Sequence, residues 1–329
     1  MRRWMTACCF LLASTLSFST PLSQRPDVNA FINTMVKKHH FERAKLVTLF
    51  DHVKIRPKVI HAMKHAKEHL PWYRYRTIFL NPERITLGVN FWHRYKKTLA
   101  QAEKQYGVPA EIIVAIVGVE SYYGARKGTY PVIDALTSFA FNYPSRQKFF
   151  TRELEEFLLF AREENLDPLS IKGSYAGAMG QPQFMPSSYR AYAVDFSHTG
   201  HRDLMDDEID VIGSVANYLK QNGWKANQLV AMPATVSGSA YENLPKQGRK
   251  PTLSLNALAH YGIHPKEHTD AHQKALFYAF EGKGHPDFWL GFNNFYVITR
   301  YNTSPLYAMA VYQLGQAIKN ARMIGLKHA

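Results

Sequence analysis

The sequence predicts a mainly α-helical protein of the α+β class, in which one small mixed α/β module interrupts a series of helices. Apolar residues recur at helical spacing over most of the 329 residues, and helix boundary signals such as Asn81-Pro82 and Gly107-Val108-Pro109 separate these stretches. Residues 226–292 differ, because Ala234 to Ser239 and Pro251 to Leu255 are typical of short strands. With 46% hydrophobic residues, the chain can form a large core.

The first 19 residues have the three parts of a secretory signal peptide. A short positive region, Met1-Arg2-Arg3, precedes an apolar run from Trp4 to Leu16 and then small residues, with cleavage expected near Ser19. The run is too short to span a bilayer comfortably. Cys8 and Cys9 both lie within it, too early for a lipoprotein. We therefore predict a periplasmic, cysteine-free mature protein, exported by a cleavable signal peptide and without a stable membrane anchor.

The charge balance predicts an anionic partner. Lysine and arginine outnumber aspartate and glutamate by 40 to 26, which gives a formal net charge of +14. The basic residues are scattered rather than gathered in a dense run, and export argues against nucleic acid as the partner. Aromatic residues make up 13% of the chain, which favours a surface on which sugars can stack.

The chain divides into four segments after the predicted signal peptide. Residues 20–105 form an N-terminal helical region, with basic amphipathic helices first and a helix from Asn81 to Tyr106 last. Residues 106–225 follow as a core segment that contains the most apolar helix of the chain. The small mixed insertion occupies residues 226–292, and residues 293–329 return to helix.

The most apolar helix presents one carboxyl at its end. No side chain from Ile112 to Val119 is polar, and Glu120 follows directly, in a segment that Pro109 begins and Gly124 ends. A helix that is apolar on all sides is usually buried. A desolvated carboxyl has a raised pKa and can act as a general acid near neutral pH. The alternative is a glutamate that reaches solvent at a helix end.

Other kinds of catalytic site are poorly supported. The predicted mature chain has no cysteine, no Gly-x-Ser-x-Gly motif and no His-Glu-x-x-His helix, and the 15 histidines are dispersed. A second carboxylate, which glycosidases normally use, is not evident, since Asp134 precedes Ala135-Leu136 in the manner of a helix cap. A single acid favours a reaction in which the substrate supplies the second group, as the acetamido oxygen of an N-acetyl sugar can.

Two loops are candidates for ligand contacts. Residues 173–186 contain three glycines and two prolines, which indicate a shaped loop that fits neither a P-loop nor a dinucleotide fingerprint. Residues 195–206 have oxygen-bearing side chains at alternate positions and Gly200 at the sixth, as in an EF-hand loop. Because Thr199 and Asp206 replace the usual residues, we expect either a weak structural calcium site or a turn held by local hydrogen bonds.

Several long motifs occur in a fixed order along the chain. They are Val119-Glu-Ser121, Phe141-Asn-Tyr-Pro144 with Arg146, Gly173 to Gly180, Gln183 to Tyr189, Gly213 to Tyr218, Asn294 to Asn302 and Tyr307 to Val311. Together they resemble the membrane-bound lytic murein transglycosylase B family over nearly all of the predicted mature chain. The resemblance implies a lysozyme-like fold, with residues 106–225 as the catalytic core and residues 293–329 completing that core and its groove.

The same resemblance implies an activity and a set of site residues. The family cleaves the MurNAc-GlcNAc β-1,4 bond of peptidoglycan without water, which leaves 1,6-anhydroMurNAc ends. Glu120 corresponds to the single catalytic acid/base, assisted by the acetamido group of the substrate, and Arg146 to an arginine near the peptide stem. Positions that match the sugar groove are Ser174, Gln183, Tyr218, Tyr301 and Tyr307. Positions that match the calcium loop are Asp195, Ser197, Thr199, His201 and Asp210.

The resemblance further implies that no cofactor is required and that the partners are glycan strands with peptide stems, along with other cell-wall enzymes. Three differences from the family pattern stand out. No cysteine for lipidation follows the apolar signal region, Thr199 replaces an aspartate in a calcium loop that also has an extra residue before Asp210, and Ser145 replaces a frequent second arginine. Two alternatives stay open: a hydrolytic muramidase on the same fold, and a non-catalytic peptidoglycan-binding scaffold.

Overall fold

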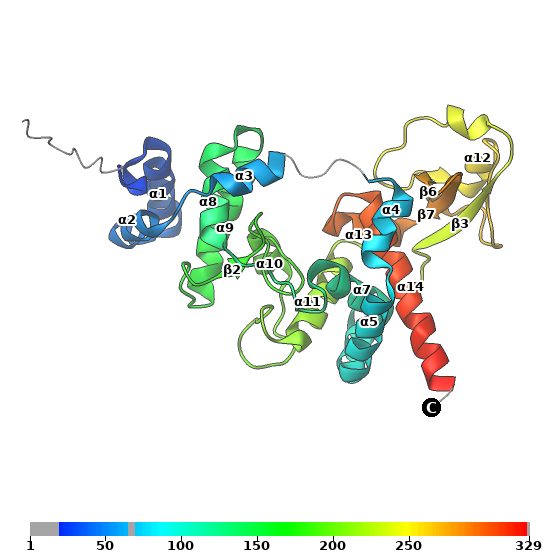
Figure 1. Ribbon diagram of the computed structural model, residues 1–329, viewed down its shortest axis with the longest axis horizontal. Coiled ribbons are helices and arrows are strands. Elements are labelled where there is room, and N and C mark those ends of the chain that lie inside the picture. The colour runs from blue at the N-terminus through cyan, green and yellow to red at the C-terminus, as the bar shows by residue number, and fades with distance from the viewer. Residues whose placement is uncertain (1–19, 65–69, 328–329) are drawn as a thin grey trace, which may run out of the picture. The chain divides into compact units, whose positions relative to one another are not determined.

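The computed structural model describes residues 20–64 and 70–327, which are mainly helical, as predicted (Figure 1). The predicted signal peptide, residues 1–19, lies outside the described residues. The chain forms two compact units, Met1–Val53 and Lys54–Ala329. Within the described ranges, no helix combines the length and the apolar character needed to cross a bilayer.

The first unit contains a helical hairpin. A single 3-10 turn, η1 (Leu22–Gln24), leads into α1 (Pro26–His39), and α2 (Arg43–His52) folds back beside it. Phe31 of α1 and Phe50 of α2 meet edge to face, with their ring centroids 5.9 Å apart. Both rings are buried, so the apolar face of each amphipathic helix is covered.

In the second unit, helices surround α7 (Ala110–Ser121). The helices of this unit are α3 (Pro57–Lys64), α4 (Trp72–Phe79), α5 (Pro82–Arg94), α6 (Lys96–Tyr106), α8 (Val132–Asn142), α9 (Gln147–Glu163), α10 (Pro186–Tyr192), α11 (Glu208–Gln221), α12 (Leu255–Ala259), α13 (Asn293–Tyr301) and α14 (Pro305–Lys327), with the 3-10 helices η2 (Pro144–Arg146) and η3 (Ala240–Asn243). Helices α5, α6, α11 and α14 pack directly on α7. Every residue from Ala110 to Gly118 is buried, which confirms the prediction made from the apolar pattern.

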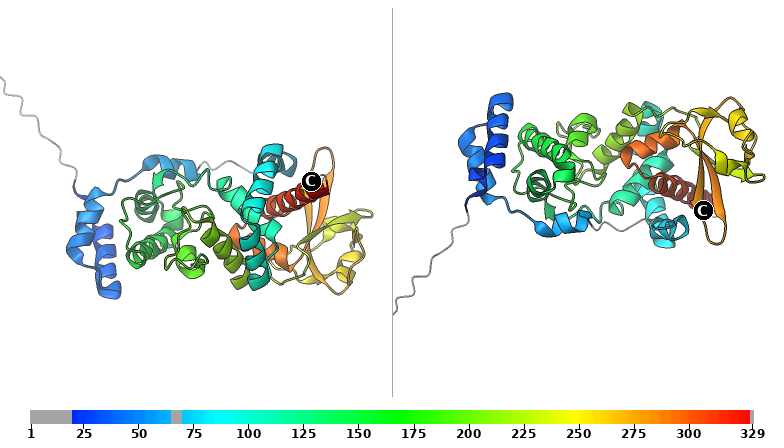
Figure 2. Two further views of the ribbon diagram at one scale, coloured as in Figure 1. Left: turned by 90° about the horizontal axis from the view of Figure 1, so that it is seen from below. Right: turned by 90° about the horizontal axis from the view of Figure 1, so that it is seen from above.

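Helix α14, the last in the chain, completes this helical core. Its backbone approaches α7 closely at Gly315, where a Cβ atom would lie 2.9 Å from the carbonyl oxygen of Glu111. A glycine is therefore required for this packing distance. In both views of Figure 2, α14 (red) lies beside α5 (cyan), with which it is also in contact. The helices α5 and α14, which are far apart in the sequence, thus both pack on α7.

Two helices expected from the sequence are each divided. The helix expected from Asn81 to Tyr106 is interrupted at Tyr95, whose φ of −106° and ψ of 26° end α5 before α6 begins. The single C-terminal helix expected for residues 293–329 is instead α13 followed by α14. Asn302 is extended, and Pro305 lacks the N–H needed to continue a helix, so it begins a new one.

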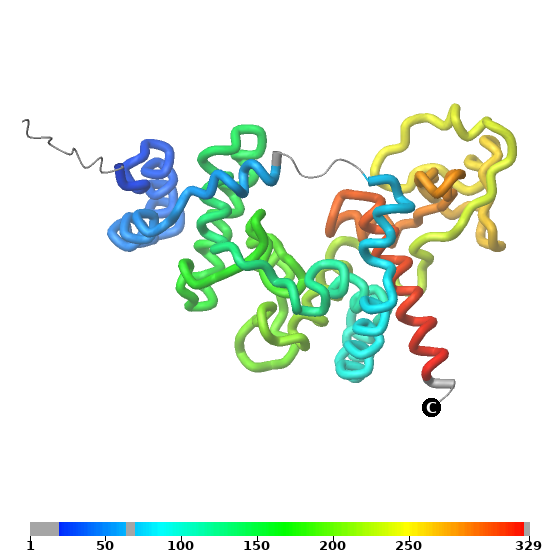
Figure 3. The backbone as a smooth tube through the Cα atoms, viewed as in Figure 1, coloured from blue at the N-terminus to red at the C-terminus, as the bar shows by residue number. Residues whose placement is uncertain are grey.

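The mixed module is a five-stranded antiparallel sheet in the order β4-β6-β7-β3-β5. Its strands are β3 (Ala231–Val236), β4 (Leu253–Ser254), β5 (Ile263–Pro265), β6 (Lys274–Glu281) and β7 (Pro286–Gly291). A hydrophobic core of its own includes Leu258, Phe277 and Leu290. The chain between β3 and β6, yellow in Figure 3, makes a long excursion that carries η3, β4 and α12. Within that excursion the Gln247 side chain bonds both backbone polar groups of Phe277 and so holds the loop against the sheet.

Candidate active site

Glu120 lies in the last turn of α7, where the helix ends abruptly. Tyr122 and Tyr123 both have left-handed backbone angles, with φ of 56° and 58°, so the chain turns away from the helix axis two residues after Glu120. The Ser121 hydroxyl holds this turn by accepting a hydrogen bond of 3.0 Å from the backbone N–H of Gly124. The helix therefore ends three residues before Gly124, and Glu120 is held at a fixed, tightly turned terminus.

The Glu120 carboxyl has one neutral hydrogen-bond donor. The hydroxyl of Tyr307, in the first turn of α14, donates to Glu120 Oε1 at 2.5 Å. Burial raises the pKa of Glu120 to about 7, and the bond from Tyr307 limits the rise. Burial also raises the pKa of Tyr307 well above its ordinary value, so the phenol keeps its proton. Glu120 can therefore be protonated or ionised near neutral pH, as a group that acts in turn as acid and base requires.

Three tyrosines form a continuous group beside Glu120, which we call the tyrosine wall: Tyr218 of α11, Tyr301 of α13 and Tyr307 of α14. The rings of Tyr301 and Tyr307 are stacked at 15°, with centroids 6.4 Å apart, and those of Tyr218 and Tyr301 are 4.7 Å apart. The charge of Glu120 raises the pKa of all three, after the larger effect of burial. Helix α11 and the consecutive helices α13 and α14, all distant in sequence from α7, thus converge on one carboxyl.

The tyrosine wall is tied to the surrounding backbone. Tyr301 donates its phenolic proton to the carbonyl oxygen of Pro182 at 2.5 Å, and Tyr218 donates to that of Arg300 at 2.6 Å. Because a phenol has one proton, both hydroxyls can only accept a hydrogen bond from a ligand. These bonds fix the positions of Tyr218 and Tyr301 beside Glu120.

Ser174 and Gln183 shape the glycine-dotted loop. The Ser174 hydroxyl accepts from the backbone N–H of Ala178 at 3.0 Å, and Gln183, at a positive φ of 52°, donates to the carbonyl oxygen of Lys127 at 3.1 Å. Gly128 makes the closest backbone approach, since a Cβ there would lie 2.1 Å from Gly173. This approach adjoins the short ladder between β1 (Tyr130–Pro131) and β2 (Lys172–Gly173). The loop is therefore anchored to the chain that leaves Glu120.

Arg146 stands apart from this group. It is exposed at the end of η2, and its guanidinium lies over the rings of Phe149 and Phe150, at 4.4 and 5.2 Å from their centroids. None of the interactions recorded for the described residues joins Arg146 to Glu120 or to the tyrosine wall. Arg146 is thus not part of the group of side chains around Glu120.

Three buried carboxyls outside the loop from Asp195 to Asp210 have structural partners. Asp134, near the start of α8, forms a salt bridge of 2.7 Å with Arg56 and accepts the backbone N–H of Lys54. Glu153 accepts both the N–H and the hydroxyl of Ser187 at the start of α10. Glu153 is buried within α9, because it caps the next helix. The third, Glu111 of α7, is paired with Lys319 of α14 at 2.8 Å.

Two residues near Glu120 were not identified from the sequence. Tyr75 of α4 has its pKa raised by burial and by the charge of Glu120, so it adds a fourth tyrosine to the surroundings of that carboxyl. Arg84 of α5 is buried and donates to the carbonyl oxygen of Gly118 at 3.1 Å, with its guanidinium 4.5 Å from the ring centroid of Tyr122. It satisfies a carbonyl of the last turn of α7. Neither has a local pattern that marks it, although Tyr75 lies in a conspicuously aromatic segment.

The loop from Asp195 to Asp210 is held mainly by its own hydrogen bonds. Asp195 accepts the N–H groups of Thr199 and Gly200, and Asp210 accepts those of Phe196 and Ser197 through one carboxylate oxygen. These bonds match the expected alternative of a turn held by local side chains. Across residues 20–64 and 70–327, no group of three or more His, Cys, Asp or Glu side chains could hold a metal ion.

Oxygen atoms nevertheless converge inside this loop. The Ser197 hydroxyl lies 3.5 Å from that of Thr199, which lies 3.4 Å from the carbonyl oxygen of His201. Hydroxyl and carbonyl oxygens at alternate positions are ligands that calcium accepts. Asp206, at the twelfth position, is instead paired with Lys127 at 2.5 Å. The residues thus fit a calcium ion in part, with Asp195 as the main charged ligand.

Comparisons with known proteins place the chain in one family. The model of the transglycosylase SLT domain matches residues 23–316. Membrane-bound lytic murein transglycosylase B of Escherichia coli (strain K12) is 44% identical over 312 residues, which cover 92% of this chain and 85% of that protein.

Two solved structures agree with this result. Catenated lytic transglycosylase SltB1 from Pseudomonas aeruginosa has a TM-score of 0.87 and 46% identity, covering 91% of this chain and 98% of that chain. The Escherichia coli lytic transglycosylase Slt35 in complex with calcium has a TM-score of 0.85 and 44% identity, covering 92% and 95%. The lysozyme-like fold and the resemblance inferred from the motifs are confirmed.

Proposed function

The chain belongs to the transglycosylase SLT domain family, and we propose that Glu120 is the single acid and base of its active site. The protein is a peptidoglycan lytic transglycosylase. The observation that supports the assignment of Glu120 is its raised pKa of about 7 together with the neutral hydrogen-bond donor Tyr307. A carboxyl with these properties can give up a proton and take one back within a single reaction.

In the proposed reaction, Glu120 begins protonated. It donates its proton to the glycosidic oxygen between MurNAc and GlcNAc as the bond from that oxygen to C1 of MurNAc breaks through an oxocarbenium-like state. GlcNAc leaves with the proton, and the acetamido oxygen of MurNAc stabilises C1. The ionised Glu120 then takes the proton of the MurNAc C6 hydroxyl, whose oxygen bonds to C1 and closes a 1,6-anhydro ring. Glu120 ends protonated, and no water is consumed.

Tyr307, the hydrogen-bond partner of Glu120, has a role in both halves of the proposed reaction. The Tyr307 hydroxyl donates most strongly to the ionised carboxyl, so it stabilises the state that forms between the two proton transfers. As a neutral phenol it does so without fixing the negative charge, which a lysine or arginine at the same place would do. Tyr307 is therefore a positioning residue for both halves of the reaction.

The substrate is proposed to lie along the tyrosine wall and the loop that contains Ser174 and Gln183. Sugar rings stack on aromatic faces, and Tyr301 is the half-buried member of the wall, whereas Tyr218 and Tyr307 are buried. The glycan strand with its peptide stems is the expected polymer, and the positive net charge of +14 suits its carboxylates. Arg146 is proposed to contact a peptide stem away from Glu120.

Calcium, if bound, would have a structural role. Asp195, Ser197, Thr199 and the carbonyl oxygen of His201 would hold it, and the ion would stabilise the loop that precedes α11. Asp210 would support the loop through its backbone bonds. The chemistry proposed for Glu120 does not involve the ion.

Export to the periplasm is part of the proposal, because peptidoglycan lies outside the cytoplasm. The predicted signal peptide and the absence of a lipidation cysteine after it rest on the sequence alone. Recovery of the processed chain in a periplasmic fraction, with an N-terminus near Ser19, is the expected result of cell fractionation and N-terminal sequencing. A lipid-modified product in the membrane fraction would contradict this part of the proposal.

Product analysis tests the reaction itself. Purified glycan strands digested with the protein are expected to give fragments that end in 1,6-anhydroMurNAc, identified by mass spectrometry. Fragments heavier by one water would instead show a hydrolytic muramidase. If the strands stayed intact under all conditions, a binding scaffold would replace the catalytic proposal.

A further inference from the structure

A cavity in the second unit, Lys54–Ala329, lies beside α13, on the side of the small sheet. Its volume is about 540 Å³, which is within the ~300–1,000 Å³ typical of ligand-sized sites. Three lysines line it: Lys225 after α11, Lys250 in the excursion between η3 and β4, and Lys274 at the start of β6. No acidic residue is among the residues that line the cavity. We call this cavity the lysine pocket.

The three ammonium groups lack acidic partners within the part of the chain that the structure describes. None of Lys225, Lys250 and Lys274 takes part in a salt bridge there, whereas Lys127 and Lys319, elsewhere on the same unit, are each paired with a carboxylate. Like charges gathered around one cavity repel one another unless an anion enters it. The positive charge around the cavity therefore favours a ligand with negative charge.

The rest of the lining selects among anions. Tyr296 presents an aromatic ring, with Lys250 Nζ 5.5 Å from its centroid, and Asn222 and Asn293 bring side-chain amides. Amides both donate and accept hydrogen bonds, which suits peptide groups, and the ring suits an aliphatic side chain. A cavity of this size with three separate point charges fits a peptide that carries several carboxylates better than a single small ion.

The lysine pocket is close to the tyrosine wall because the same helices build both. Asn222 follows Tyr218 of the wall by four residues, one turn beyond it at the end of α11. Tyr296 precedes Tyr301 of the wall by five residues on α13, a rise of roughly 7.5 Å at 1.5 Å per residue. An extended peptide spans about 3.3–3.6 Å per residue, so two or three residues cover the interval.

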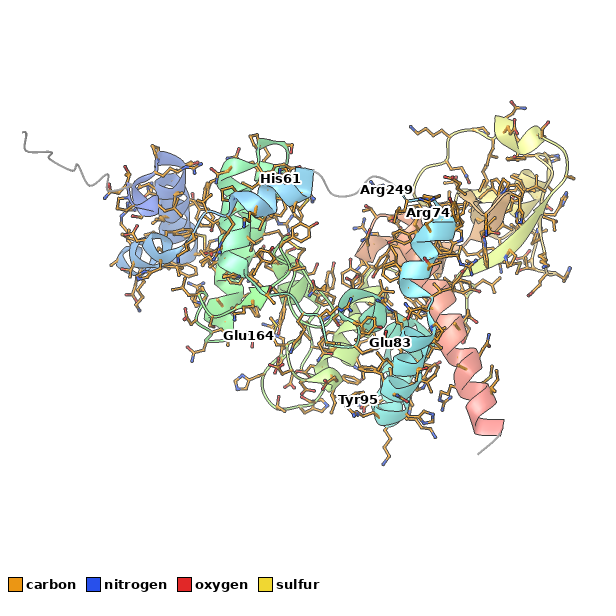
Figure 4. The ribbon with its side chains drawn as sticks, viewed as in Figure 1. His61, Arg74, Glu83, Tyr95, Glu164 and Arg249 are labelled. Carbon is orange, nitrogen blue, oxygen red and sulfur yellow. The ribbon has the colours of Figure 1, made fainter. Side chains whose placement is uncertain are left out.

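We propose that the lysine pocket binds the carboxylate-bearing peptide stem of a glycan strand whose sugars lie on the tyrosine wall. This inference rests on the proposed function, since it takes the substrate from there. The pocket would hold the strand by a part of the substrate that does not react, and so would favour strands that carry peptides over bare strands. Arg249, labelled in Figure 4, precedes Lys250 in the loop that lines the pocket, so the loop itself is basic.

Binding can be measured with the full chain carrying Glu120→Gln, so that cleavage does not interfere. The probe is a stem tetrapeptide with its carboxylates free, titrated by isothermal calorimetry at low salt, and the same peptide with the carboxylates amidated. We expect the free acid to bind at least ten times more tightly than the amide. Replacing Lys225, Lys250 and Lys274 together with Gln is expected to weaken binding of the free acid at least tenfold.

A charge-matched control separates the pocket from the net charge of the protein. Lys220, Lys246 and Lys283 are exposed, and none of them lines the pocket. Replacing these three with Gln removes the same charge and is expected to change the affinity less than twofold. An equal loss in both triple variants would overturn the proposal, as would competition by inorganic phosphate at the concentration of the peptide, which would indicate a general anion site.

The same variants separate this inference from the proposed function when Glu120 is intact. Wild type and control are expected to cleave peptide-bearing strands with a higher kcat/KM than bare strands, and the pocket variant is expected to lose most of that preference. If the pocket variant keeps the full preference while the products remain 1,6-anhydro sugars, the inference fails and the proposed function stands. If wild type cleaves neither strand, the proposed function fails.

Discussion

The two glutamates of α7 differ in what α14 offers them. Glu111 is buried and Glu120 is half-buried on the same helix, and both are held by side chains of the same partner helix. Glu111, in the first turn, meets the ammonium group of Lys319, whereas Glu120, in the last turn, meets the neutral phenol of Tyr307. A cation fixes a carboxylate in its charged form, but a phenol stabilises that form and leaves the proton exchangeable.

The ends of α7 reinforce this difference. The first turn of a helix, which holds Glu111, carries partial positive charge, and the last turn carries partial negative charge, which disfavours an ionised Glu120. Burial acts on Glu120 in the same direction and raises its pKa to about 7. One helix thus holds a structural carboxyl at one end and a carboxyl suited to proton transfer at the other.

Exchange of each carboxyl for an amide is the strongest test of the comparison. Glu120→Gln removes the transferable proton and is expected to lower the rate of glycan cleavage about 10³-fold, the typical range for a general acid-base group being ~10²–10⁴. The matched control, Glu111→Gln, is expected to keep the rate within about threefold while it lowers stability by ~1 kcal/mol. Cleavage of purified strands and urea unfolding measure the two effects. Equal loss of activity in both variants would mean that Glu120 has no special role.

The next largest effect is expected in how the unfolding free energy depends on pH, which the raised pKa of Glu120 controls. The folded pKa of Glu120 is about 7 and its ordinary value is 4.5, so the folded state retains a proton that the unfolded state has lost between these values. The stability that this proton contributes is fully present below pH 4.5 and is lost as the pH rises through 7. Relative to wild type, Glu120→Gln is therefore expected to gain about 3 kcal/mol in unfolding free energy at pH 8, but nothing near pH 4. Denaturant unfolding at both values measures this; a gain that is independent of pH would contradict it.

Removal of the phenol should have a smaller effect on the reaction. Tyr307→Phe deletes a hydrogen bond to a charged group, worth roughly 1.5–3 kcal/mol, so we expect a loss of about ten- to a hundredfold in kcat. Because the bond from Tyr307 lowers the pKa of Glu120, its loss raises that pKa further. The alkaline limb of the pH-rate profile should then move to higher pH. Tyr301→Phe, which loses a bond to Pro182 rather than to Glu120, is expected to leave that limb in place.

The smallest expected effect concerns the loop from Asp195 to Asp210. Calcium at millimolar concentration is expected to raise the melting temperature of wild type by no more than a few degrees, since a ligand at ten times its Kd contributes about 1.4 kcal/mol. Thr199→Asp adds a second charged ligand and should bind calcium more tightly, with a larger shift. Magnesium is the control, because it demands a more rigid geometry. If calcium changes the melting temperature of neither protein, the loop is held by its hydrogen bonds alone.

Much of the fold could be predicted because burial leaves a periodic signal in the sequence. The apolar run from Ile112 to Val119 predicted a buried helix, and strand-like stretches marked the small sheet module. The division of the helix expected from Asn81 to Tyr106 was missed, because Tyr95 interrupts it through backbone angles that no motif announces. The division before α14 is marked in the sequence by Pro305, which cannot continue a helix. No local pattern marks Glu153 as buried, because its partner, Ser187, lies on another helix.

The candidate site, too, could be predicted only in part from the sequence. Glu120 could be found from its own neighbours, and the ordered motifs indicated Ser174, Gln183 and the tyrosine wall as groove positions. Those motifs did not reveal that the phenols of Tyr218 and Tyr301 are bonded to backbone carbonyls, or that Arg146 has no recorded contact with the Glu120 group. Tyr75 carried no pattern of its own. The lysine pocket combines residues from four separate segments, so no local sequence pattern marks it.

The sequence by itself determined that a carboxyl would end an apolar helix, because hydrophobic spacing is a local property of the chain. Only the tertiary structure decided which partner each glutamate of α7 meets. Tyr307 lies 187 residues after Glu120, and Lys319 lies 208 residues after Glu111. The packing of α14 against α7 brings a phenol to one carboxyl and an ammonium group to the other. That choice separates a group able to exchange its proton from one that is held in a salt bridge.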